Sequence, residues 1–197
     1  MKMDEQELMR RIQGGDDAAF EEIVTMYKNR IVNYIYRLTG DYKRAVELSQ
    51  ETFMRVYFKA NRWKPVAPLS SWIYAIAGNL AKTDLKKRRR AVQMPLDDLH
   101  DQVSSGVALR EDPVMNSMVK RMRTALGTLH PRYRIPIILK DIEGFTQEEI
   151  AEMLKKPVGT IKARISRGRG YLRQAMEKSS TSIKFATENR ELENGRV

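Results

Sequence analysis

The chain has 197 residues, with 36 Lys and Arg against 25 Asp and Glu, which gives a formal net charge of +11. This length suffices for one or two small domains with real cores, and the charge favours a polyanionic partner such as nucleic acid. The absence of cysteine and the presence of only two histidines, His100 and His130, exclude disulfides, thiolate metal sites and Cys/His nucleophiles, so no metal or cofactor is predicted.

The pattern is helical almost throughout, and strand signals are absent. The acidic, polar N-terminus has no signal-peptide core, and no apolar run could cross a bilayer, so we expect a cytoplasmic protein without membrane insertion. Asp4 opens a short helix that ends at Gly14. Asp16 begins a long helix whose apolar residues keep i, i+3, i+4 spacing as far as Gly40, and Asp41 then caps a third.

A loop from Asn61 to Leu69, stiffened by two prolines, leads to a fourth helix from about Ser70 to Arg90. We predict that Trp72 packs in the core and that Trp63, in the loop, can stack on unpaired bases. One face of the fourth helix forms a predicted outward stripe, small at its start and basic at its end, made of Ser71, Ala75, Gly78, Asn79, Lys82, Lys86 and Arg89.

The end of this helix is strongly basic. Between Lys82 and Arg90 there are six basic residues and a single acid, Asp84, which lies nearer the buried side and is interpreted as a structural ion-pair partner. A stripe with this charge could bind phosphates with release of counterions. A solvated helix end that complements the helix dipole would show the same run of cations, so the run alone does not decide between the two.

Residues 95–112 lack periodicity and carry five acids against one arginine, a charge of −4. They are predicted to be a linker, and helices are expected at 114–129 and 131–143, with a kink at Pro136. The predicted fold is all-α, with two small helical domains joined by a flexible acidic linker. The predicted boundaries are 1–92 for the first domain, 93–112 for the linker, 113–177 for the second domain and 178–197 for a disordered tail.

The second domain contains a helix-turn-helix pattern. Thr146 and Glu149 form a capping box at the start of one helix, and Pro157 interrupts the pattern and begins the next, which should run to about residue 175. From Thr160 to Arg173 there are five basic residues and no acid. On a helical wheel Gly159, Ala163, Ser166 and Arg167 face outward with Thr160 and Lys162 on the flanks, so this helix is predicted to read a major groove rather than to be only a solvated basic helix.

Four ordered segments together carry a family resemblance: Ala45–Tyr57, Ser71–Arg88, Glu143–Leu154 and Pro157–Arg167. They resemble the successive signatures of the extracytoplasmic-function group of bacterial sigma factors. The resemblance implies a non-enzymatic subunit that binds core RNA polymerase and promoter DNA. The first domain would melt and read the minus-10 element, the second would read the minus-35 element, and the linker would thread toward the RNA exit path.

The resemblance and the wheels give three sets of candidate residues. The polymerase-binding set is Glu47, Leu48, Gln50, Glu51, Phe53 and Arg55. The minus-10 set is Asn61, Arg62, Trp63, Ser71, Asn79, Lys82, Lys86 and Arg89. The minus-35 set is Lys156, Gly159, Thr160, Lys162, Ala163, Arg164, Ser166 and Arg167.

Two other classes of protein stay open at this point, as does the question whether an anti-sigma factor binds the chain. A stand-alone helix-turn-helix regulator would need a dimerisation surface, and no heptad repeat or long apolar hairpin offers one. A nucleic-acid enzyme would need paired carboxylates for metals or a nucleophile, and the outward basic faces contain neither, so no catalytic residue is predicted.

Overall fold

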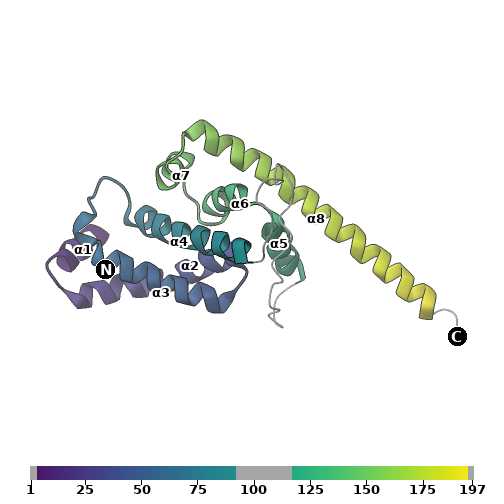
Figure 1. The fold of residues 1–197 in the computed structure, drawn as a ribbon, viewed down its shortest axis with the longest axis horizontal. Coiled ribbons are helices and arrows are strands. Elements are labelled where there is room, and N and C mark those ends of the chain that lie inside the picture. Colours follow the sequence, from purple (N-terminus) through teal and green to yellow (C-terminus); the bar gives the residue numbers. More distant parts are fainter. Residues whose placement is uncertain (1–3, 92–116, 195–197) are drawn as a thin grey trace.

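The computed structural model describes the backbone of residues 4–91 and 117–194, and the side chains of residues 4–90 and 118–178. All regular structure in these ranges is helical, as predicted (Figure 1). The predicted linker, 93–112, lies outside the described residues.

The first half of the chain forms four α-helices whose starts follow the predicted caps. The Asp16 carboxylate accepts the N–H of Ala19 at 3.1 Å, and the left-handed Gly40, at φ 73°, ends the long helix. The elements are α1 (Glu5–Gln13), α2 (Asp17–Thr39), α3 (Tyr42–Phe58), the short 3-10 turn η1 (Ala60–Arg62) and α4 (Leu69–Ala91).

The core of this half lies between α2, α3 and α4. Apolar side chains that α2 places three and four residues apart are completely buried, including Ile23, Ile31, Ile35 and Leu38. They pack with Ala45 and Val56 of α3 and Ile73 and Ala77 of α4. The i, i+3, i+4 spacing of apolar residues in α2 therefore corresponds to one continuous buried face of the helix.

The buried face of α4 is rotated relative to the prediction. Ser71 and Gly78, expected in the outward stripe, are buried, whereas Trp72 is half-buried. A side-chain carbon added to Gly78 would lie 2.8 Å from the hydroxyl of Tyr34, so the missing side chain lets α4 approach α2 closely. The predicted stripe is wrong at Ser71 and Gly78 and holds for Asn79, Lys82 and Lys86, which are exposed, while Ala75 and Arg89 are half-buried.

The second half consists of α5 (Ser117–Thr128), α6 (Pro131–Ile137), a π-helical turn η2 (Ile138–Ile142), α7 (Gln147–Leu154) and α8 (Val158–Asn194). The distortion predicted at Pro136 is a change of helix type, because α6 gives way to the π-helical turn directly after Ile137.

The helix-turn-helix has the predicted capping box at Thr146 and Glu149, and the left-handed Lys155, at φ 51°, ends α7. Gly168 brings α8 close to α6, since an added side-chain carbon there would lie 2.5 Å from Ile137. In the structure α8 continues to Asn194, with no proline or glycine to interrupt it after Gly170, whereas the sequence predicts disorder from residue 178. Figure 1 shows this end of α8 projecting away from the other helices.

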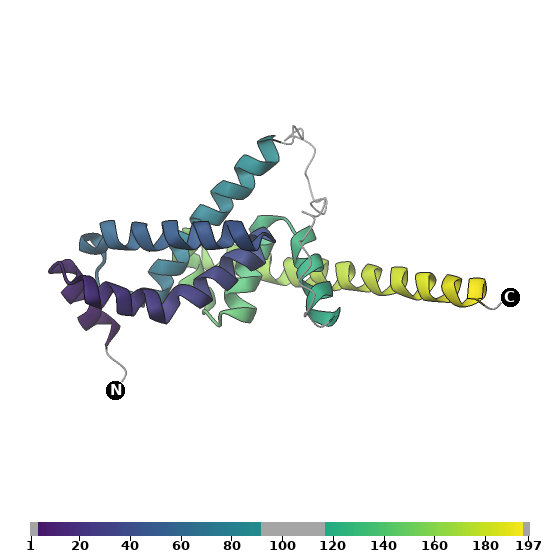
Figure 2. The same cartoon turned by 90° about the horizontal axis from the view of Figure 1, so that it is seen from below.

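The two halves pack against each other and share one continuous cluster of buried apolar residues. The contacts join α2 to α5 and α6, and α4 to α7. Figure 2, seen from below, also shows the helices of the second half beside α2 and α4, with α8 running away from them. Two separate domains on a linker were predicted, and the packing between them was not.

Candidate nucleic-acid and polymerase interfaces

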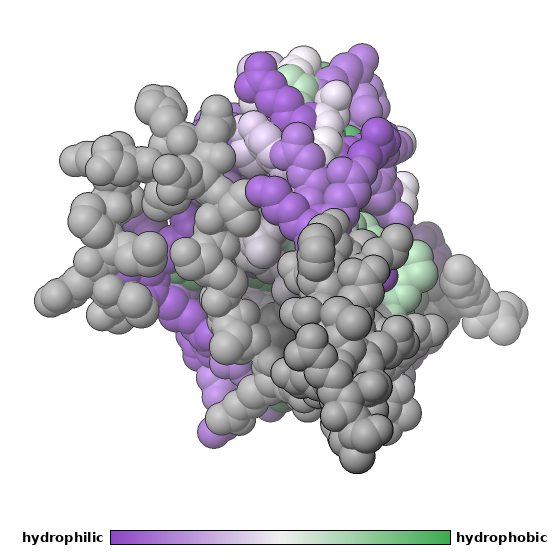
Figure 3. All heavy atoms as spheres, turned by 90° about the vertical axis from the view of Figure 1, so that its right-hand side faces the viewer, coloured by the Kyte–Doolittle hydropathy of each residue, from purple (hydrophilic) through white to green (hydrophobic). Residues whose placement is uncertain are grey.

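The start of α8 presents a polar and basic surface. Lys162, Ala163, Ser166 and Arg167 are exposed, and Ile161 and Ile165 are buried against α7 and α6. Of the other residues predicted for minus-35 contact, Lys156 and Gly159 are exposed and Thr160 and Arg164 are half-buried. Hydrophilic side chains also gather at the top of the face seen in Figure 3, the end of the molecule at which α7 and the start of α8 lie. The structure thus brings the minus-35 candidates onto one accessible surface.

The cations of α8 differ in their surroundings. Arg169 forms a bidentate ion pair with Asp141, at 3.0 and 2.5 Å. This pair holds its guanidinium against η2 of the same domain and away from the outward face of α8. Arg167 is exposed and carries no ion pair with any described residue. Its guanidinium, with its planar fork, is therefore available to a base edge on this surface.

The basic residues at the end of α4 also fall into two groups, some held in ion pairs and others exposed. Asp84, predicted to be an ion-pair partner, is buried and lies 2.7 Å from Arg44 and 2.8 Å from Arg88, which confirms that prediction. Arg88 also lies 3.2 Å from Asp41, the N-cap of α3. These ion pairs hold α4 against α3, and they leave Arg88 less available to bind a phosphate. Lys82, Lys86, Lys87 and Arg90 remain exposed.

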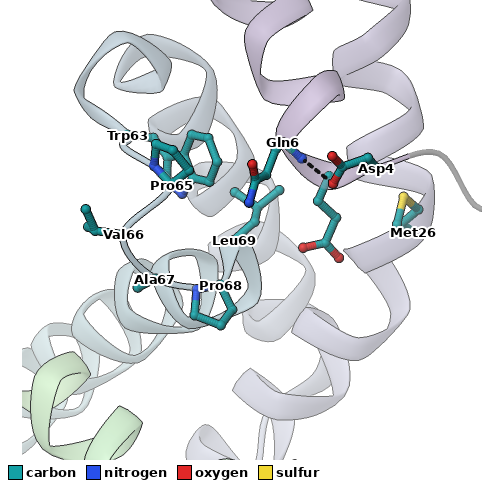
Figure 4. Close-up of a pocket in the computed structure, with 10 residues that line it drawn as sticks. Asp4, Gln6, Met26, Trp63, Pro65, Val66, Ala67, Pro68 and Leu69 are labelled. Atoms are coloured by element: carbon teal, nitrogen blue, oxygen red, sulfur yellow. Dashed lines mark hydrogen bonds between the residues drawn. The ribbon is translucent and has the colours of Figure 1, made fainter.

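The loop before α4 encloses a pocket of about 520 Å³. Figure 4 shows the loop from Trp63 to Leu69 on one side of this pocket and the start of α1 with Met26 of α2 on the other. The side chain of Gln13 donates to the backbone carbonyls of Ala60 and Trp63, at 2.9 and 3.2 Å, and so ties the loop to α1.

This anchoring corrects the expectation for Trp63, while Trp72 packs against the core as predicted. Trp63 is only 8% exposed and belongs to the core, so it is not the exposed stacking ring that its loop position suggested. Its minus-10 companions Asn61 and Arg62 are exposed, whereas Ser71 is buried at the start of α4.

The predicted polymerase-binding residues lie on two sides of α3. Glu47, Gln50 and Arg55 are exposed and Glu51 is half-buried, with Glu51 and Arg55 paired at 2.7 Å. Leu48 and Phe53 belong to the core between the helices, so in this structure their side chains do not reach the surface where a partner would bind. Motif position alone could not separate them, because both faces of a helix contribute to one motif.

The structure adds apolar residues to the exposed face of α3. Phe58 is 77% exposed and Met54 is 58% exposed, one helical turn apart at the end of the helix. A rim of charges around exposed apolar side chains is typical of a protein interface. The signal in the sequence was available, since Met54 and Phe58 share the spacing of Glu47, Gln50 and Glu51.

A cluster of cations lies where the two domains meet. Arg134 is buried and donates to three carbonyls at the ends of α2 and α5, those of Leu38 at 2.5 Å, of Leu129 at 2.7 Å and of Gly127. Burial, together with the charge of Arg89, lowers the pKa of Arg134 to about 10. Sequence reasoning missed this residue, although an arginine among the apolar neighbours Tyr133 and Ile135 was a signal.

His130 lies beside this cluster and caps α6. Its Nδ1 accepts the N–H of Arg132 at 3.1 Å. Burial, followed by the charges of Arg89, Arg132, Arg134 and Arg164, lowers the pKa of His130 to about 4. The imidazole is therefore neutral at pH 7, as its role as a hydrogen-bond acceptor requires.

Within the described ranges no helix is long and apolar enough to span a membrane. No group of three His, Asp or Glu side chains in the part of the chain whose side chains are described is placed to hold a metal ion.

Comparison with known proteins gives matches to both halves of the chain. Residues 23–91 match the family Sigma-70 region 2, and residues 120–172 match Sigma-70, region 4. The chain is 30% identical over 184 residues to the ECF RNA polymerase sigma factor SigW of Bacillus subtilis, an alignment that covers 89% of this chain and 98% of that protein. It is 33% identical over 176 residues to the ECF RNA polymerase sigma factor SigE of Mycolicibacterium smegmatis, covering 85% of this chain and 66% of that protein.

A solved structure agrees with these matches. The sigma factor RpoE from Bartonella quintana, in complex with the anti-sigma factor NepR, aligns with a TM-score of 0.65 at 26% identity, over 80% of this chain and 96% of that chain.

Proposed function

Since the chain belongs to the extracytoplasmic-function sigma factors of bacterial RNA polymerase, we propose that its two domains divide promoter recognition between them. It binds core RNA polymerase and directs transcription initiation at promoters. In our proposal residues 1–92 bind the polymerase and open the minus-10 element, 93–112 link the domains, and 113–177 read the minus-35 element. We also propose that the protein acts in the cytoplasm.

The surface of α8 carries the proposal for the minus-35 element. The exposed residues Lys162, Ser166 and Arg167 offer donors to base edges and phosphates, and the small side chain of Ala163 leaves room for a thymine methyl. No acid lies between Thr160 and Arg173 to repel the DNA backbone.

For the minus-10 element we propose two cooperating parts of the first domain. The exposed cations of α4, Lys82 and Lys86, follow the phosphate backbone. The pocket beside the loop receives an unpaired base, whose amino groups could donate to the acidic side chains of Asp4 and Glu5 in its wall. Melting supplies such unpaired bases.

For the polymerase we propose the exposed face of α3, with Glu47, Gln50, Glu51 and Arg55 around Met54 and Phe58. The RpoE structure contains an anti-sigma factor, and on that likeness we propose that an anti-sigma factor also regulates this chain.

Reconstituted transcription tests the proposed function. Core RNA polymerase with this protein should produce defined transcripts from a library of promoter variants, and core enzyme alone should not. Footprints should then cover both elements. If the free protein binds operator-like sites with nanomolar affinity and the polymerase adds nothing, the alternative of a stand-alone regulator is correct.

A further inference from the structure

One side of α8 carries a row of polar and basic side chains beside the residues proposed to read bases. Four exposed residues follow one another at i, i+4, i+7 and i+11, the spacing that keeps residues on one side of a helix. The members of this row, here called the flank row, are Lys162, Ser166, Arg169 and Arg173. The row is about 16 Å long, at roughly 1.5 Å per residue. The sides of a helix that lies in the major groove are nearest the phosphates, so the flank row is placed to follow one DNA strand.

An acid from another element neutralises one member of the flank row. Asp141, in η2, accepts hydrogen bonds from Nε of Arg169 at 3.0 Å and from one of its terminal nitrogens at 2.5 Å. These bonds raise the pKa of Arg169 above its ordinary value, so the guanidinium keeps its charge. Lys162 and Arg173, by contrast, form no ion pair with any residue whose side chain the structure describes. The middle of the row is therefore paired, while both its ends are available to phosphates.

Packing between α6 and α8 holds Asp141 at this position. Figure 1 shows α8 running across α6. Tyr133 and Ile137 of α6 both lie against Gly168 of α8, where an added side-chain carbon would be 3.1 and 2.5 Å from them. Asp141 follows Ile137 by four residues, about one turn further along, and meets Arg169, the neighbour of Gly168. The close approach of the two backbones thus fixes both ends of the ion pair.

The ion pair lowers the affinity of α8 for DNA without changing its base contacts. Each phosphate that a protein neutralises adds about 0.9 to the slope of log K against log salt, whatever the sequence. Arg169 bound to Asp141 contributes no such contact, and the Asp141 carboxylate itself repels phosphates. A uniform reduction of this kind matters most for imperfect DNA sites, because a good site stays occupied after the loss and a poor site does not.

We propose that Asp141 sets the stringency with which α8 selects minus-35 elements. By withholding Arg169 from the DNA backbone, it keeps imperfect elements below the affinity needed for initiation. Asp141 is thus a positioning residue that determines specificity through Arg169 and does not itself touch DNA. This inference rests on the proposed function, because it assumes that α8 lies in the major groove of the minus-35 element.

Binding of the full-length protein to a labelled DNA duplex of scrambled sequence tests the role of Asp141. Fluorescence anisotropy at salt concentrations between about 50 and 200 mM gives the affinity and its salt slope. Asp141→Asn frees Arg169, so the slope should steepen by about 0.9. The affinity at about 0.1 M salt should rise by up to about eight-fold, since a slope of 0.9 corresponds to that factor over a tenfold range of salt.

Two further variants separate the release of Arg169 from a general change of charge. Glu152→Gln removes an exposed acid of α7 in the same domain, and no described side chain forms an ion pair with it. It changes the net charge as Asp141→Asn does but releases no cation, so it measures the effect of charge alone. In an Arg169→Gln background, Asp141→Asn should change the binding no more than Glu152→Gln does.

A purely structural role of the ion pair predicts the opposite sign. If Asp141 only held α8 against η2, Asp141→Asn would weaken binding to every duplex and lower the melting temperature. Thermal unfolding identifies the variants that remain folded. A folded Asp141→Asn protein that binds scrambled DNA no more tightly than Glu152→Gln would overturn the proposal.

The consequence for transcription is a loss of discrimination. With core polymerase, Asp141→Asn should increase initiation from weak minus-35 variants by up to about eight-fold and leave the best variants unchanged, because these are already occupied. No increase on any variant, or an equal increase on all of them at saturating holoenzyme, would also overturn the proposal. Failure of the unchanged chain to support transcription with saturating core enzyme would instead overturn the proposed function, and the binding to scrambled DNA needs no polymerase.

Discussion

At the scale of single residues, the two most informative side chains are a neutral histidine and an unpaired arginine. His130 can cap α6 only while its Nδ1 is unprotonated, and its folded pKa of about 4 lies below its ordinary value of 6.5. The stabilisation it provides is therefore present above pH 6.5 and is lost as the pH falls toward 4.

We expect the free energy of unfolding of His130→Asn to depend less on pH between 6.5 and 4, because an asparagine oxygen caps a helix without titrating. Denaturant unfolding of both proteins at pH 7.0, 5.5 and 4.5 gives the comparison. The free energy of unfolding should fall more steeply for the unchanged chain than for His130→Asn. Parallel curves would mean that His130 does not titrate differently in the folded state.

Arg167 and Arg173, on the same helix, should contribute in different ways. Arg167→Ala should cost about 1–3 kcal/mol on the correct minus-35 element and relax preference at one base position. Arg173→Ala, further along α8, should weaken all sequences alike and reduce the salt slope by about one unit. Transcription from a library of minus-35 variants decides between them. A uniform loss for Arg167→Ala would make it a phosphate contact only.

At the scale of elements, α3 provides a test of polymerase binding. Glu51→Lys reverses a charge on the exposed face and should lower affinity for core enzyme about ten-fold, or ~1.4 kcal/mol. Because the ion pair of Glu51 among the described side chains is with Arg55 on the same helix, the variant should lose no more than about 0.5 kcal/mol of stability. Glu21→Lys, an equal charge reversal at an exposed position of α2, serves as the control in pull-down with core enzyme. If core enzyme retained Glu51→Lys and Glu21→Lys equally, the polymerase-binding face would not include Glu51.

The end of α8 provides a second test at this scale. Arg121 donates to the carbonyl of Met176 at 3.4 Å, a contact between α5 and α8 that lies before residue 182. Deleting residues 182–197 should therefore leave promoter-directed transcription and the melting temperature unchanged. A large loss of activity would show that this part of α8 has a partner.

The sequence predicted the elements well because their signals are local. Asp16, Asp41 and Thr146 cap their helices through neighbours within three residues, and Gly40 ends α2 by its own backbone conformation. The helix-turn-helix and its basic outward face follow from the same short-range rules. The extension of α8 was missed because a polar composition was given more weight than the absence of a helix breaker.

At the scale of the whole molecule, the errors come from contacts between distant residues. Trp63 is buried because Gln13, fifty positions earlier, holds its loop, and the face of α4 is set by Gly78 against Tyr34. The contact of Glu143 with Arg37 spans 106 positions. Neither periodicity nor a motif indicates contacts between residues so far apart in the sequence. The sequence therefore predicted which residues form each surface, but not how the surfaces are placed relative to one another.

The ring of Phe145 against Tyr74 has a consequence for temperature. Separating the two packed halves would transfer apolar ring surface into water, and such exposure raises the heat capacity. The free energy of packing between the halves must then depend on temperature along a curve, and its apolar part weakens on cooling. Through these two aromatic side chains the contact between the halves is less stable in the cold, without any change in the DNA-reading residues.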